Sequence, residues 1–97
     1  MNLYMLKLME APSVLTEACA VCGSVASDKH HVVPRSQGGK DGPRITLCGM
    51  GNVNGCHGRV HDHTLHFRWG ECGWEVCETR FPTKRENIPE DAHWRPM

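Results

Sequence analysis

Two pairs of cysteines constrain the fold of this chain more than any other feature. Cys19 and Cys22 are separated by two residues, and Cys48 and Cys56 follow as a second pair with a longer gap. Two thiolate pairs separated by roughly two dozen residues can close a tetrahedral zinc site. The spacing therefore predicts one structural Zn²⁺ bound by these cysteines, and four ordinary buried cysteines are the alternative.

The composition favours a fold that a metal stabilises. The 97 residues include three Trp, two Phe and one Tyr, so the core is small, and metal binding contributes folding free energy directly. A secreted disulfide scaffold is the other use of six cysteines. Lys7 and Glu10 interrupt the first apolar segment, and no apolar run reaches membrane-spanning length. We therefore expect a cytoplasmic protein that makes no membrane contact.

Positive charge gathers in the middle of the chain, although the formal net charge is zero. Residues 29–68 contain six basic and two acidic residues, and both flanks are acidic. A polyanion such as DNA would bind along this basic stretch. Chance clustering on a solvated face gives the same pattern.

The sequence predicts one domain, 1–97, in four segments. They are a short helix or extended arm over 1–17, a core over 18–66, a β-hairpin over 67–81 and an irregular tail over 82–97. Within the core we expect strands at 30–34 and 44–48, loops at 35–43 and 49–55, and a helix over 56–63. The alternating residues 65–81 predict the hairpin, with its turn near 70–73.

The histidines predict a second metal site. His57 and His61 are four residues apart, so on a helix they share one face and form half of a divalent-metal site. His30 and His31 are neighbours on a predicted strand, so their side chains point to opposite faces. If the strand folds against the helix, one of the two completes a three-imidazole site. The other is free to take a proton from water as a general base.

These motifs together resemble a known family. The sequence CAVCG…HHVVPRSQGG…LCGMGNVNGCHGRVH, residues 19–61, resembles the zinc-knuckle subgroup of HNH endonucleases that is common in phages and prophages. The resemblance implies a small α+β fold with a ββα-metal (His-Me finger) core, stabilised by a four-Cys zinc knuckle and followed by a C-terminal β-hairpin. It also implies one catalytic divalent ion, Mg²⁺, Mn²⁺, Ni²⁺ or Zn²⁺, beside the structural Zn²⁺.

The resemblance gives each motif residue a role. His31 falls at the position of the general base. His30, His57 and His61 fall at the positions of the catalytic-metal ligands. The ligands of the structural zinc are Cys19, Cys22, Cys48 and Cys56.

One position departs from the family pattern. Pro43 stands where the family usually has an asparagine that orients the loop between the two strands. Asn52 and Asn54, in the later loop, are candidates to replace it.

The implied activity is metal-dependent hydrolysis of DNA phosphodiester bonds, by nicking or double-strand cleavage, with 5′-phosphate products. The expected partners are DNA and, by resemblance, a phage packaging terminase. Arginines of the basic stretch are candidates to hold flanking phosphates. Arg59, which lies between the two helix histidines in the sequence, and Arg35 are preferred, and Arg44 is a third candidate.

Two other interpretations stay open. A zinc-stabilised module would bind DNA or a protein without cutting, and the zero net charge and Pro43 favour it. A purely structural protein would bind two zinc ions, with His63 or His66 as the fourth ligand beside the three histidines. An open fourth position would instead favour catalysis.

Overall fold

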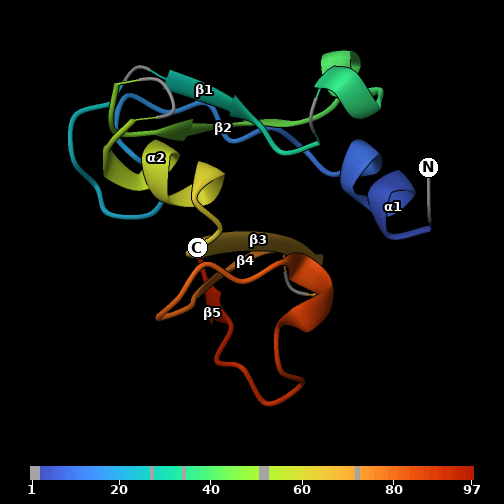
Figure 1. The fold of residues 1–97 in the computed structure, drawn as a ribbon. Helices are drawn as coiled ribbons and strands as arrows, with labels where there is room; N and C mark the ends of the chain where they lie inside the picture. The colour runs from blue at the N-terminus through green and yellow to red at the C-terminus, as the bar shows by residue number, and fades with distance from the viewer. Residues whose placement is uncertain (1–2, 27, 34, 51–52, 72) are drawn as a thin grey trace.

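The protein is a small α+β structure in which a short helix contacts two antiparallel sheets (Figure 1). The computed structural model describes residues 3–26, 28–33, 35–50, 53–71 and 73–97. The first sheet pairs β1 (Asp28–His31) with β2 (Arg44–Leu47), and the second contains β3 (Leu65–Gly70), β4 (Gly73–Glu78) and β5 (Arg95–Pro96). Helix α2 (Gly55–His61) contacts both β2 and β3. The expected α+β class is therefore confirmed.

The helices are short. Helix α1 (Leu3–Glu10) precedes an extended arm, so the N-terminal segment combines the two alternatives expected from the sequence. The predicted loop 35–43 contains two single-turn 3-10 helices, η1 (Arg35–Gln37) and η2 (Gly39–Asp41). Within the described ranges, no helix has the length and hydrophobicity needed to cross a membrane.

The β1–β2 ladder ends at a proline. His31 lies opposite Arg44, so Val32 and Pro43 would form the next pair. Val32 N–H donates to the Pro43 carbonyl at 3.2 Å, but Pro43 has no N–H to give in return. Strand β1 therefore ends at His31, earlier than the strand predicted over 30–34, whose last residue lies outside the described part of the chain.

The hairpin after α2 is confirmed, whereas the prediction of an irregular tail is wrong in part. Strand β3 ends at Gly70 and β4 begins at Gly73, as the predicted turn requires. The tail contains η3 (Arg85–Asn87) and the two-residue strand β5, which pairs with β4. A strand of one arginine and one proline has no alternating pattern, so its sequence could not reveal it.

The extended arm places β2 at the centre of the first sheet. Val14 N–H donates to the Arg44 carbonyl at 2.8 Å, and Thr46 N–H donates to the Val14 carbonyl at 2.9 Å. The side chains of Ile45 and Leu47 on β2 are fully buried in the hydrophobic core. The hydrophobic core extends from these residues to the second sheet and includes two of the four predicted zinc ligands, Cys19 and Cys56.

Trp74 connects the arm to the second sheet, because its indole Nε1 donates to the Pro12 carbonyl at 2.8 Å. We predict that Trp74→Phe lowers the free energy of unfolding by about 1 kcal/mol through loss of this bond. Amide hydrogen exchange should become faster over residues 11–18. Trp69→Phe, at an indole that is 37% exposed, is the matched control. Equal effects of the two substitutions on exchange in the arm would contradict this role of Trp74.

Candidate metal centres

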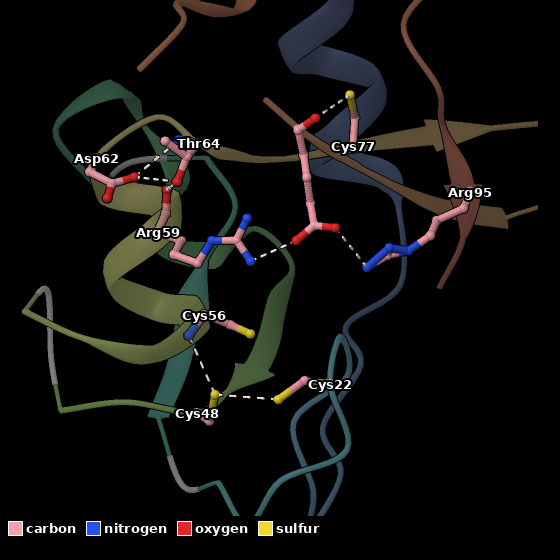
Figure 2. A network of polar contacts seen from close by, with 9 residues as sticks. Cys22, Cys48, Cys56, Arg59, Asp62, Thr64, Cys77 and Arg95 are labelled. Carbon is pink, nitrogen blue, oxygen red and sulfur yellow. Dashed lines mark hydrogen bonds and ion pairs between the residues drawn. The ribbon is translucent and has the colours of Figure 1, made fainter. Parts of the chain in front are cut away.

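The four cysteines meet where three segments of the chain come together. Cys19 and Cys22 lie in the turn after the arm, Cys48 directly follows β2, and Cys56 lies in the first turn of α2. Their sulfur atoms lie within 4.8 Å of one another, and Cys22 Sγ and Cys48 Sγ are 3.6 Å apart (Figure 2). Zinc–sulfur bonds of about 2.3 Å at the tetrahedral angle separate two sulfurs by about 3.8 Å. The cluster therefore has the dimensions of a zinc site.

Two glycines allow the chain to return from β2 to α2 within this cluster. Gly49 and Gly55 have φ values of 116° and 66°, which L side chains rarely adopt. A Cβ atom at Gly55 would also lie 2.6 Å from the carbonyl oxygen of Cys48. That carbonyl accepts a hydrogen bond from His57 N–H at 3.0 Å, and Cys56 N–H donates to Cys48 Sγ at 3.3 Å. These two hydrogen bonds hold the start of α2 against the end of β2.

The cysteines differ in how readily they ionise. The side-chain hydrogen bond with Ser24 lowers the pKa of Cys22 to about 6. Burial raises the pKa of Cys56, because a thiolate loses its solvation there. A buried thiolate needs a positive partner, and zinc supplies one. The donor set of the cluster therefore fits a soft divalent cation.

Three histidines form a second cluster between β1 and α2. One ring nitrogen of each of His30, His57 and His61 lies within 4.8 Å of the others, and His57 Nε2 and His61 Nε2 are 3.2 Å apart. Metal–nitrogen bonds of about 2.0–2.1 Å at the tetrahedral angle separate two nitrogens by about 3.3 Å. Burial, followed by the neighbouring His57 and His61, lowers the pKa of His30 to about 3. His30 is therefore neutral at neutral pH, which is the form that binds metal.

Asp28 orients one of these imidazoles, and sequence reasoning did not identify it. His57 Nδ1 donates to Asp28 Oδ2 at 3.0 Å. A carboxylate only accepts hydrogen bonds, so the proton lies on Nδ1 and Nε2 directs its lone pair into the cluster. Asp28 precedes His30 by two residues on β1, so both side chains share one face. This spacing of two was the signal in the sequence that could have revealed Asp28.

The histidine cluster contains three potential protein ligands among the described residues. The two candidates for a fourth ligand do not join it. His66 Nε2 instead contacts Thr79 Oγ1 at 3.1 Å, and His63 is exposed after the end of α2. Three imidazoles leave one position of a tetrahedral ion for water or substrate, which is the pattern of catalytic rather than structural sites.

His31 follows His30 on β1 and points to the other face of the strand. Its Nδ1 is buried, and no described residue gives this atom a hydrogen bond. A buried polar atom without a partner costs about 1–3 kcal/mol, so such atoms are rare in folded proteins. His31 is therefore placed apart from the three-histidine cluster, as the candidate base requires.

Two of the three candidate arginines, Arg35 and Arg59, lie away from the histidine cluster. Arg35 is exposed in η1, which belongs to the loop that connects β1 to β2. This loop is at the end of the hairpin away from α2 (Figure 1). Arg59 lies about 200° around the helix from His57, because each residue turns an α-helix by about 100°. Its guanidinium Nη1 is 2.6 Å from Glu78 Oε1 and lowers the pKa of Glu78 (Figure 2). The helix thus turns Arg59 away from the imidazoles, and phosphate binding by Arg59 stays a prediction.

The loop at Pro43 closes without the asparagine of the family pattern. The Pro43 carbonyl accepts the Val32 N–H, and any residue can supply a carbonyl. Asn54 Oδ1 accepts a hydrogen bond from Met50 N–H at 2.8 Å, so Asn54 orders the loop before α2 rather than the β1–β2 loop. Asn52 lies outside the described residues.

No family model matches the chain, and no curated protein or solved structure matches it either. The chemistry of the two clusters is therefore inferred from their residues and geometry. The four cysteines have the dimensions and donor atoms of a structural zinc site. The three histidines lie close enough together to bind a divalent ion, and no fourth ligand joins them among the described residues.

We predict that Cys19→Ser removes one equivalent of bound zinc and lowers the melting temperature, because a hydroxyl replaces one of four thiolates. Metal content is measured after dialysis with a colorimetric chelator. Cys77→Ser is the matched control, since Cys77 is also buried but lies in β4, outside the cluster. It should lower stability without changing the zinc content. An unchanged zinc content in Cys19→Ser would exclude the knuckle.

We predict that Asp28→Asn weakens Ni²⁺ binding at the histidine cluster by roughly 10–100-fold, because His57 loses its orienting acceptor. The measurement is a calorimetric titration of protein whose cysteine site is already filled with zinc. Asp91→Asn, an exposed carboxylate in the tail, is the control and should bind Ni²⁺ like wild type. Equal affinities of the two variants would show that Asp28 does not orient a metal ligand.

Proposed function

We propose that the protein is a metal-dependent DNA endonuclease whose β1, β2 and α2 form a ββα-metal core. The observation that carries this proposal is the convergence of His30, His57 and His61, which no fourth ligand joins among the described residues. His31 follows His30 and points to the opposite face of β1. The motif resemblance over residues 19–61 points to the same activity. Neighbouring residues on one strand thus divide metal binding from proton transfer.

In this proposal His30, His57 and His61 would hold a divalent ion. Such an ion would supply positive charge to stabilise the negative charge that develops on the phosphate and on the leaving 3′ oxygen. His31 takes a proton from the attacking water, whose oxygen forms a bond to phosphorus. The P–O3′ bond breaks, the leaving 3′ oxygen takes a proton from solvent water, and the products are a 3′-hydroxyl and a 5′-phosphate. The four-cysteine zinc site has no part in these steps, and it fixes the position of α2.

A DNA-binding or protein-binding zinc module is the alternative. It requires the cysteine site but gives no reason for three convergent imidazoles with an open position. The carboxylate of Asp28 behind His57 also favours a metal site, because oriented histidines are typical of metal ligation. Only a measurement of cleavage separates the two proposals.

We predict that zinc-replete wild-type protein nicks or linearises supercoiled plasmid in at least one of Mg²⁺, Mn²⁺, Ni²⁺ or Zn²⁺. His31→Ala should reduce the rate by about 10²–10⁴-fold, because it removes the general base, and should keep its melting temperature and metal content. A chelator added before the metal should abolish cleavage.

The control for this comparison is His93→Ala, which removes an exposed imidazole from the tail. Its rate should equal that of wild type. Absence of cleavage with every metal, from wild-type protein that retains its zinc, would reject the nuclease and favour the binding module. Full activity in His31→Ala would retain the nuclease and reject His31 as its base.

A further inference from the structure

The β1–β2 register places the side chain of Arg44 beside that of His31. The two residues lie directly opposite each other in the ladder. Arg44 N–H donates to Ser13 Oγ at 2.9 Å, and its carbonyl accepts from Val14 N–H at 2.8 Å, so both of its backbone groups point away from β1. His31 and Arg44 therefore form a non-hydrogen-bonded pair, in which the Cβ atoms lie about 4.5–5.5 Å apart on the same face.

Strand β1 itself lies between this pair and the histidine cluster, and its outer edge is the one away from β2. No strand of the described residues pairs with that edge. By the alternation of an antiparallel ladder, the backbone N–H and carbonyl of His31 point to the same edge. His30, which belongs to the cluster, lies on one face of β1. His31, with Arg44 beside it, lies on the other face.

The charge of Arg44 is also available for a ligand. No acidic side chain of the described residues forms an ion pair with it, and the side chain is half-buried. Arg59 and Arg68, by contrast, pair with Glu78 and Glu75. A guanidinium without a carboxylate partner retains all its donors for the paired oxygens of a phosphate.

We propose that Arg44 binds a non-bridging oxygen of the scissile phosphodiester from the face of the hairpin that carries His31. This inference rests on the proposed nuclease function and extends it, because it names the residue that holds the phosphate toward the base. It also separates the three candidate arginines. Arg44 contacts the reacting phosphate, Arg59 links α2 to β4, and Arg35 lies in the loop that connects β1 to β2.

The test compares Arg44→Ala and Arg44→Lys with Arg80→Ala, which removes one exposed positive charge elsewhere. Single-turnover cleavage should fall by about 100-fold in Arg44→Ala, because one charged donor to the transition state is lost. Arg44→Lys should recover part of the rate, since it keeps the charge but not the paired donors. Arg80→Ala should cut like wild type.

A second readout is independent of cleavage. DNA affinity is measured against salt concentration in proteins that also carry His31→Ala. Adding Arg44→Ala should reduce the slope of log affinity against log salt by about one, because one phosphate contact is lost. Adding Arg44→Lys or Arg80→Ala should leave the slope unchanged. Melting temperature and zinc content confirm that each variant is folded.

The outcomes separate this inference from the nuclease proposal. Cleavage by wild type and Arg44→Ala at equal rates would overturn the role of Arg44 and keep the nuclease. Absence of cleavage in wild type, with a salt slope that still depends on Arg44, would keep the phosphate contact and reject the nuclease. Slopes that do not depend on Arg44 would overturn the contact. Equal losses in the Ala and Lys variants, with lower melting temperatures, would assign Arg44 a structural role and also overturn it.

Discussion

The cluster of four thiols fixes the start of α2 against the end of β2, and the position of the histidine cluster depends on this junction. Cys48 directly follows β2, and Cys56 lies in the first turn of α2. Backbone N–H groups of Cys56 and His57 bond the Cys48 sulfur and carbonyl. His57 and His61 follow Cys56 by one and five residues, so anchoring Cys56 places both imidazoles opposite His30. A metal ion bound by the four thiols would therefore determine where His57 and His61 lie, and with them the geometry of the histidine cluster.

Side chains alternate between the two faces of β1, so this short strand directs residues with different roles to each face. Asp28 and His30 lie on the face toward α2, where one orients His57 and the other joins the cluster. His31 lies on the opposite face, where the register brings Arg44 beside it. The ladder ends immediately afterwards because Pro43 lacks an N–H group. A four-residue strand can therefore present a candidate metal ligand, a carboxylate that orients His57 of α2, and a candidate base.

The sequence predicted those parts of the fold and site that local spacing determines. The separation of His57 and His61 indicated a helical face, because it depends on contacts near in sequence. The cysteine spacing indicated one cluster although Cys22 and Cys48 are 26 residues apart, because two thiolate pairs are what a tetrahedral zinc site requires. The same rules applied further would have identified Asp28, two residues before His30. Helix rotation would likewise have placed Arg59 on the side of α2 away from the imidazoles.

Other features depend on contacts between distant segments, which local patterns do not encode. The pairing of β5 with β4 joins residues about 20 apart, and the bond from Trp74 to the Pro12 carbonyl joins residues 62 apart. The end of β1 at His31 depends on Pro43 in the facing strand, although the apolar residues after His31 suggested that the strand continues. The proximity of Arg44 to His31 likewise required the register of the ladder.

We propose that the histidine cluster binds a divalent ion and leaves a position of that ion for substrate. X-ray absorption at the nickel edge tests it most directly, on protein whose cysteine site is filled with zinc and whose second site is loaded with one equivalent of Ni²⁺. We expect three imidazole nitrogens around the nickel, with oxygen atoms of solvent as the remaining ligands and no sulfur. A shell filled by a fourth imidazole, a sulfur signal, or failure to retain Ni²⁺ would contradict it.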